Sequence, residues 1–299
     1  MKNKYLAVIA LSLLFITASC DKELPFPIDE VKKGVLIDVV RVAGTDGVLS
    51  DGLTTGNYKI KLTIPENQGD YSFMKNAQLL AVLQNTNGTT TSKVVIDNIT
   101  AFPQEITLNI ADVYQKFGLT APALGQILSF TTNIVLNDGS TIPGWSAEVG
   151  FNNKAFSGWA VEGRLYSSNV RYSVACPLDL NDFVGTCTIT LDEWWGDTPY
   201  PVEVTRKSAT ELSVEGMFDG AAERVLVITV DPTDHSVSIA RQILAPNSGL
   251  DWWGNPGYSN FSLSGGVGTI NACNLSISFS ATATVDAGSF GGMSFELVK

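Results

Sequence analysis

The most regular pattern in the chain is an alternation of apolar and polar residues with a period of two. In residues 58–64, apolar side chains occupy every even position and polar side chains the odd positions between them. Because neighbouring residues of a strand point to opposite faces of a sheet, this alternation predicts a β-strand with one buried face. Similar runs predict further strands over residues 36–42, 78–84, 93–99, 105–110 and 127–136.

Short turn clusters separate these predicted strands. Residues 44–47, 85–88 and 137–140 are rich in Gly, Asn, Asp and Thr, and the pair Asp138-Gly139 supplies the positive φ angles of a tight hairpin. Residues 111–117 are the one segment here that predicts a helical turn. About seven short strands over about 110 residues are typical of an immunoglobulin-like β-sandwich, which we assign to residues 34–145.

The second half of the chain, residues 146–299, predicts an antiparallel β-meander. Short hairpin loops over residues 206–210 and 231–234 join consecutive strands. Such a meander must close into a barrel or pack as two sheets to protect its edges. The predicted fold class is therefore all-β, with strands over residues 187–191, 202–205, 211–215, 225–230, 237–243, 276–285 and 293–298.

The N-terminus carries the pattern of an export signal. Two lysines precede an apolar run over residues 5–16, which is shorter than the roughly 20 residues of a membrane span. Small residues then lead to Cys20, so residues 1–19 predict a lipoprotein signal peptide. Its cleavage would leave Cys20 as an acylated, palmitate-bearing anchor followed by a tether over residues 20–33. The alternative is ordinary secretory cleavage beside an incidental cysteine.

Composition and charge narrow the classes of function. The 299 residues carry a net charge of −11, which gives no electrostatic reason to bind nucleic acid. The single histidine, His235, excludes a multi-histidine metal site, and we expect it to be exposed in a turn. The chain has no nucleophile elbow, Walker loop or dinucleotide-binding glycine motif. We therefore expect a protein that is not an enzyme and holds no metal.

Three cysteines remain beyond the anchor: Cys176, Cys187 and Cys273. An exported protein can form disulfides. Cys176 and Cys187 could close a small loop, Cys187 and Cys273 could join two neighbouring strands, or all three could be buried thiols. The sequence leaves these pairings open.

Two tryptophan pairs are the most distinctive candidates for a binding site. Each pair is followed by glycine and flanked by acidic or amide side chains. Indole rings stack on the apolar faces of sugars, while carboxylates and amides bind the hydroxyls, so the pairs predict a glycan site with one ring of each pair exposed. The alternative is that the rings fill the ends of a barrel. The candidate residues are Trp194, Trp195, Trp252, Trp253, Asp192, Asp197, Asp251 and Asn255.

The acidic residues in these two segments have two further interpretations. Their oxygen atoms could hold calcium, but their spacing matches no EF-hand loop. A pair of them could also serve a glycosidase as acid and nucleophile. Solvated loop carboxylates are the simpler interpretation, so we expect no cofactor, with calcium as the alternative.

Several segments together resemble a known class of surface protein. The lipobox Thr17-Ala18-Ser19-Cys20, the acidic tag Asp21-Lys22-Glu23 and the succession of sandwich and terminal β-domain resemble the Sus-type accessory lipoproteins of Bacteroidetes. Residues 172–180 with 185–186, and residues 268–274, are similar to segments of lipoproteins of that group. The resemblance implies a place on the outer face of the outer membrane, beside a TonB-dependent uptake system.

The leading functional hypothesis is an outer-membrane-anchored, non-catalytic lipoprotein that captures a glycan or another nutrient. Its partners would be the membrane through Cys20, a polysaccharide or oligosaccharide, and a TonB-dependent transporter complex. One alternative is a structural or assembly lipoprotein that docks on an outer-membrane transporter. A weaker alternative is a secreted glycoside hydrolase.

Overall fold

The structure is a computed structural model that describes residues 35–66, 70–152, 160–161, 164–246 and 258–299. These residues form an almost entirely β-stranded protein, as the sequence predicts. Two hydrophobic cores divide the strands into a sandwich lobe, residues 35–175, and a barrel lobe, residues 176–299. Within the described residues, no helix is long and apolar enough to cross a bilayer.

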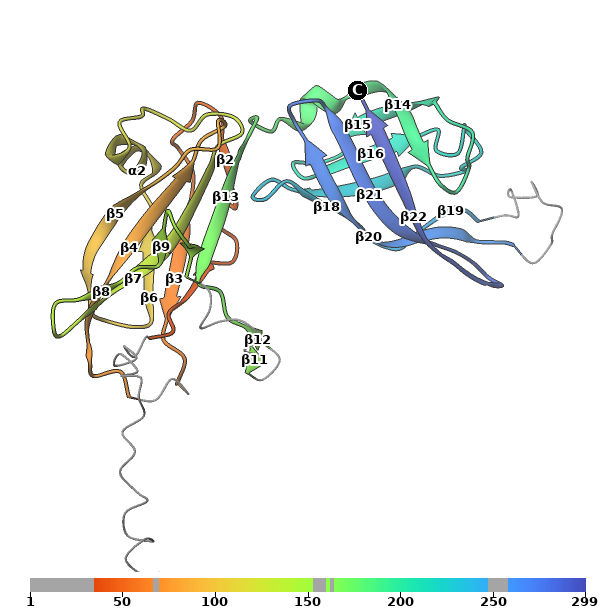
Figure 1. Ribbon diagram of the computed structural model, residues 1–299. Coiled ribbons are helices and arrows are strands. Elements are labelled where there is room, and N and C mark those ends of the chain that lie inside the picture. Colours follow the sequence, from red (N-terminus) through yellow and green to blue (C-terminus); the bar gives the residue numbers. More distant parts are fainter. Residues whose placement is uncertain (1–34, 67–69, 153–159, 162–163, 247–257) are drawn as a thin grey trace, which may run out of the picture. The chain divides into compact units, whose positions relative to one another are not determined.

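Two sheets face each other in the sandwich lobe (Figure 1). Counted in the immunoglobulin convention, β1, β3 and β6 take the places of strands A, B and E, while β4, β7 and β13 take those of C, F and G. The prediction of an immunoglobulin-like sandwich is confirmed. The first sheet contains β1 (Asp38–Arg41), β3 (Lys59–Thr63) and β6 (Gln104–Thr107); the second contains β2 (Val48–Ser50), β13 (Asn169–Ala175), β7 (Ile127–Leu136), β4 (Met74–Gln84) and β5 (Thr90–Ile99), with β8 (Thr141–Ile142) paired to β7.

The sandwich core follows from the alternation in the sequence. Ile60 and Leu62 of β3 are fully buried while their neighbours are partly exposed. Tyr172 packs edge-on against Tyr58 and Phe130, with ring centroids 5.8 and 5.9 Å apart. Helix α2 (Ile110–Lys116) begins after Asn109, whose side chain accepts a hydrogen bond from the amide of Asp112.

The predicted boundary between residues 145 and 146 is wrong. Strand β13 pairs with β7 of the sandwich, and Tyr172 and Val174 belong to the sandwich core. The first lobe therefore continues to Ala175. The segment between includes the short strand pairs β9 (Trp145–Ser146) with β10 (Gly150–Phe151), and β11 (Ala160–Val161) with β12 (Arg164–Leu165).

The barrel lobe is a closed, eight-stranded antiparallel barrel, in agreement with the predicted meander. Strand β18 pairs with β20 and closes the ring, and β19 (Gln242–Ala245) extends one edge of β20. The short 3-10 helix η3 (Leu180–Phe183) precedes the barrel. Its strands are β14 (Gly185–Asp192), β15 (Tyr200–Arg206), β16 (Glu211–Glu215), β17 (Leu226–Asp231), β18 (Ser236–Ile239), β20 (Phe261–Asn271), β21 (Ser276–Val285) and β22 (Gly288–Val298).

Closure of the barrel depends on a close approach between β18 and β20. The register of β20 against β21 shifts between Ser264 and Val267, which forms a β-bulge at Gly265 and Gly266. Gly266 pairs with Ile239 across the seam, and a Cβ atom at Gly266 would lie 2.5 Å from the Cβ of Ile239. A residue without a side chain is therefore needed at this position.

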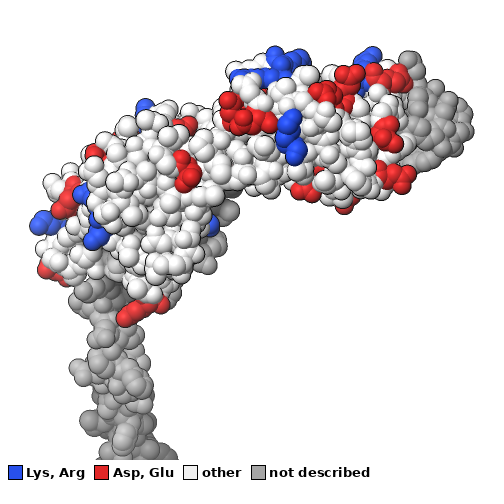
Figure 2. Space-filling view, turned by 90° about the horizontal axis from the view of Figure 1, so that it is seen from above, with Lys and Arg blue, Asp and Glu red and all other residues white. Residues whose placement is uncertain are grey.

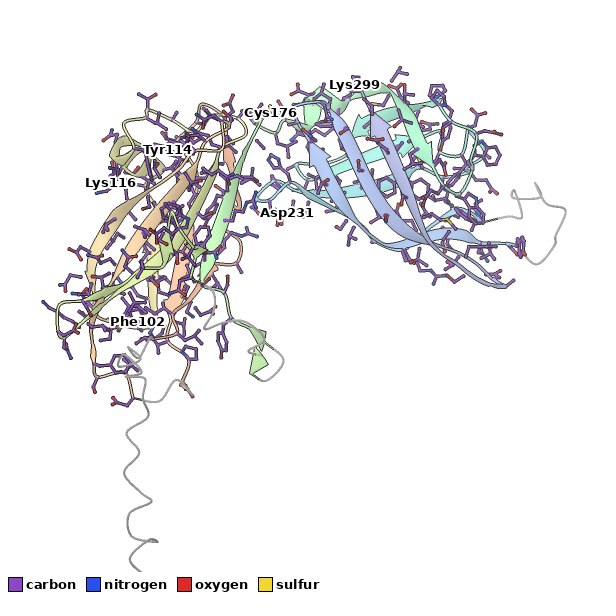
Figure 3. All side chains as sticks on the ribbon, in the orientation of Figure 1. Phe102, Tyr114, Lys116, Cys176, Asp231 and Lys299 are labelled. Atoms are coloured by element: carbon purple, nitrogen blue, oxygen red, sulfur yellow. A yellow bond between two sulfur atoms is a disulfide. The ribbon has the colours of Figure 1, made fainter. Side chains whose placement is uncertain are left out.

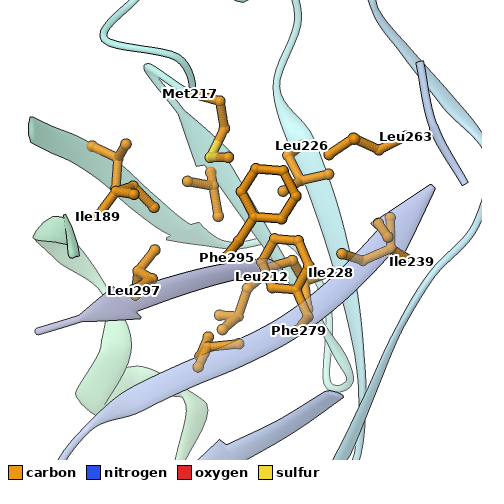
Figure 4. Packing of buried hydrophobic residues seen from close by; sticks show 14 of the residues in the cluster. Ile189, Leu212, Met217, Leu226, Ile228, Ile239, Leu263, Phe279, Phe295 and Leu297 are labelled. Atoms are coloured by element: carbon orange, nitrogen blue, oxygen red, sulfur yellow. The ribbon is translucent and has the colours of Figure 1, made fainter. Parts of the chain in front are cut away.

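Aromatic rings fill the barrel interior. Phe279 of β21 and Phe295 of β22 stack with ring centroids 5.0 Å apart, and Figure 4 shows both among the buried side chains of Leu212 and Ile228. All four residues point inward from strands in which buried and exposed side chains alternate. The core thus arises from the period-two pattern of the sequence.

The disulfide joins Cys176 to Cys273. This pairing differs from both pairings that the sequence suggested, each of which contained Cys187. Cys176, labelled in Figure 3, directly follows β13, and Cys273 lies in the turn between β20 and β21. Cys187 is a free, buried thiol because the alternation of β14 turns its side chain into the barrel. Burial raises the pKa of this thiol, in keeping with a core residue.

Candidate functional site

The end of the barrel where β14 finishes and β20 and β22 begin carries a cluster of aromatic side chains. The Trp194 ring lies 4.7 Å from Phe261 and 4.7 Å from Phe290, measured between ring centroids. Tyr258 packs edge-on against Phe290 at 5.5 Å. We call this cluster, Trp194, Trp195, Tyr258, Phe261 and Phe290, the aromatic end.

The aromatic end has a buried layer and a half-buried layer. Phe261 is fully buried and contacts Phe218 at 5.2 Å, which in turn lies 6.4 Å from the core residue Phe295. Trp194, Trp195, Tyr258 and Phe290 are only partly buried and pack on this layer. Each of these four side chains keeps an intermediate exposed fraction.

The expectation that one ring of each tryptophan pair is buried and the other exposed is wrong for the first pair. Trp194 and Trp195 are both half-buried. They lie in a turn that begins after Asp192, so the two-residue alternation of a strand does not apply to them. Both indoles can therefore contact the core and solvent at once.

Asp192 holds this turn in place. Its Oδ1 atom accepts hydrogen bonds from the backbone amides of Trp194, at 3.0 Å, and Trp195, at 2.9 Å. Its Oδ2 atom accepts a hydrogen bond from the Tyr200 hydroxyl, whose oxygen accepts one from the amide of Phe218 at 3.0 Å. The side chain that the sequence assigns to ligand hydroxyls is 2% exposed and binds the protein's own backbone, so that assignment is corrected.

The electrostatics of this network reflect its burial. Removal from water raises the pKa of the Asp192 carboxyl, and the hydrogen bonds from Tyr200 and the two amides oppose the shift. Burial and the hydrogen bond to Asp192 raise the pKa of the Tyr200 hydroxyl. When Asp192 is ionised, the Tyr200 hydroxyl therefore keeps its proton and donates it in the hydrogen bond to Asp192.

The other predicted site residues divide into two groups. Asp197 is exposed and follows the tryptophan turn, where it is accessible to a ligand. Trp252, Trp253, Asp251 and Asn255 lie outside the described residues, as does the predicted anchor Cys20. The described part of the chain holds no group of three His, Cys, Asp or Glu side chains that could bind a metal ion.

Sequence reasoning missed three members of the aromatic end: Tyr258, Phe261 and Phe290. Tyr258 lies five residues beyond the second tryptophan pair, so an aromatic residue near that pair was the available signal. Phe290 is a lone aromatic in a stretch of glycine and serine, and no local pattern marks it. The pairing of β14 with β22 brings the first part of β22 to the tryptophan turn, where Phe290 contacts Trp194.

Exposed carboxylates surround these rings. The Glu193 carboxylate accepts a hydrogen bond from the amide of Ser294 at 2.7 Å, and Asp286 accepts one from the side chain of Asn260 at 2.9 Å. Asp219 directly follows Phe218. The arrangement offers flat apolar rings for stacking and oxygen acceptors for hydroxyl donors at its rim.

Comparison with known proteins adds little to this geometry. No protein-family model and no curated protein matches the chain. Among solved structures, a DUF4466 family protein from Parabacteroides merdae aligns with 89% of this chain and 99% of its own, at 8% sequence identity and a TM-score of 0.17. A similarity this weak supports no statement about fold or function.

Proposed function

We propose that the protein is a non-catalytic binding lipoprotein that captures a glycan at the aromatic end of its barrel. It is anchored in the outer membrane through Cys20 and acts beside a TonB-dependent uptake system. The observation that carries the proposal is the set of half-buried rings, in which Trp194 packs against both Phe261 and Phe290.

The physical case rests on stacking against a preorganised surface. A pyranose ring presents an apolar face of C–H groups that stacks on an indole or phenol ring. Trp194 and Trp195 are held by their contacts with the core and by the two hydrogen bonds to Asp192, so little conformational entropy is lost when a ligand binds. We expect the exposed Asp197 to accept hydrogen bonds from sugar hydroxyls.

A polysaccharide panel tests the proposal. The full mature chain, in a detergent without a sugar headgroup, is mixed with neutral plant, fungal and bacterial polysaccharides while tryptophan emission and heat of binding are recorded. At least one polysaccharide is expected to bind and to shift the emission. If none binds and the emission is unchanged, the proposal is wrong, and docking on an outer-membrane transporter becomes the function to test.

The anchor has its own test. Labelled palmitate is expected to enter the wild-type protein, and Cys20→Ala is expected to abolish labelling and to release the protein from the membrane fraction. Cys187→Ala is the matched control, because Cys187 is a buried thiol of the barrel core and should leave labelling intact. Labelling that persists in Cys20→Ala contradicts the anchor.

A further inference from the structure

We propose that the aromatic end takes a saccharide without acidic groups and rejects saccharides that carry carboxylate or sulfate groups. This inference rests on the proposed function and adds the class of ligand. Three features of the molecule support it: the division of charge along the chain, the side chains around the aromatic end, and the position of the basic residues in the barrel lobe.

The negative charge of the chain is concentrated in the barrel lobe. Residues 176–299 contain fifteen Asp and Glu against five Lys and Arg, which accounts for −10 of the net charge of −11. Residues 1–175 contain fifteen acidic and fourteen basic residues. Figure 2 shows one face of this distribution. The electrostatic field around the barrel therefore repels anions, over a distance that shortens as the ionic strength rises.

Exposed carboxylates lie at the aromatic end itself. Asp286 binds Asn260, which precedes Phe261, and Asp219 follows Phe218, which packs on the same ring. The amide of Glu223 donates a hydrogen bond to Leu244 of β19, the strand that pairs with Phe261. With Glu193 in the tryptophan turn and Asp197 directly after it, five exposed carboxylates are present there: Glu193, Asp197, Asp219, Glu223 and Asp286.

Most of the basic residues of the barrel lobe lie at its opposite end. The Arg206 guanidinium binds the Asn181 side chain of η3 at 3.0 Å. The Lys299 ammonium binds the carbonyl of Val184, and Lys207 belongs to the hairpin between β15 and β16. Among the described residues, Arg224 and Arg241 remain on the side of the aromatic end. A ligand carboxylate stacked there would meet more negative than positive groups.

The experiment compares matched polysaccharides that differ in charge. A neutral polysaccharide that binds the full mature chain is titrated beside its carboxymethyl derivative, which keeps the same backbone. The neutral form is expected to bind at least tenfold more tightly at low salt. Because the Debye length falls from about 10 Å at 0.1 M salt to about 3 Å at 1 M, the difference should narrow as salt is added.

A charge-neutralised variant shows where the discrimination arises. Asp197→Asn, Asp219→Asn and Glu223→Gln together are expected to reduce the preference for the neutral form at least threefold. Asn is chosen at Asp219 because this residue has a φ of 51°, which asparagine tolerates. The control, Asp182→Asn, Glu203→Gln and Glu211→Gln, removes the same charge away from the aromatic end and should retain the preference.

The possible results separate this inference from the proposed function. Equal or tighter binding of the carboxymethyl derivative, or a preference that the two triple variants lose equally, overturns the inference and leaves glycan capture standing. Binding of neither form, across the panel, overturns the proposed function and the inference together.

Discussion

Asp192 is a buried carboxylate that joins the tryptophan turn to Tyr200 of the barrel wall. Its place beside the tryptophan pair is visible in the sequence, but its burial is not, because burial depends on the closing of the barrel around Tyr200 and Phe218. The carboxylate that looks available to a ligand instead satisfies two backbone amides. A similar error concerns His235, which was expected to be exposed and is half-buried.

Loss of the Asp192 carboxylate is expected to destabilise the protein. Asp192→Ala leaves the amides of Trp194 and Trp195 and the Tyr200 hydroxyl without their acceptor, so the free energy of unfolding should fall by about 3 kcal/mol. Asp197→Ala, at an exposed carboxylate of the same loop, should change it by less than about 0.5 kcal/mol. Urea unfolding measures both, and equal effects would show that Asp192 does not hold the turn.

The pH dependence of stability should also reveal Asp192. Burial raises its pKa, so the folded protein keeps this proton over a pH range above the ordinary value of 3.8, where the unfolded chain has lost it. The contribution of Asp192 to the free energy of unfolding therefore falls as pH rises through that range. Unfolding of the wild type and Asp192→Asn is measured between about pH 4 and pH 7. The wild-type value minus the variant value should decrease with pH, and an increase would contradict the raised pKa.

At the scale of elements, alternation predicts strands well because it is a local property. The runs at residues 58–64 and 276–285 correspond to β3 (Lys59–Thr63) and β21 (Ser276–Val285). The boundary of the sandwich lobe was missed because the pairing of β13 with β7 joins segments that lie far apart in the chain. The conformation of the tryptophan turn after β14 cannot be predicted from alternation, because hydrogen bonds to Asp192, rather than a hydrophobic pattern, define it.

The seam between β18 and β20 gives a prediction at this scale. Gly266→Ala places a methyl group 2.5 Å from the Cβ of Ile239, so the strands must separate and the free energy of unfolding should fall by about 1–3 kcal/mol. Gly292→Ala is the matched control, since a Cβ there meets nothing within 4 Å. Urea unfolding of the two variants decides the point, and a Gly266→Ala variant as stable as Gly292→Ala would contradict the close seam.

At the scale of the whole molecule, the disulfide was beyond sequence reasoning. Cys176 and Cys273 are 97 residues apart, and the pairing of β22 with both β14 and β21 brings the start of the barrel near the turn before β21. Cross-linking a loop of about this length lowers the entropy of the unfolded chain, so Cys176→Ser with Cys273→Ser should lower the free energy of unfolding by about 4 kcal/mol. Peptide mapping checks the pairing directly, and a disulfide that contains Cys187 would contradict the structure.

The proposed function of the whole molecule requires that a ligand binds at the aromatic end. Trp195→Ala removes one half-buried ring from this end, and Trp145→Ala removes a half-buried ring of the sandwich lobe. Calorimetric titration of both variants with a polysaccharide that binds the wild type is the most direct test, once circular dichroism shows that each is folded. We expect at least a tenfold loss of affinity for Trp195→Ala, equivalent to about 1.4 kcal/mol, and wild-type affinity for Trp145→Ala. Wild-type affinity in Trp195→Ala, or equal losses in both variants, would contradict the proposed function.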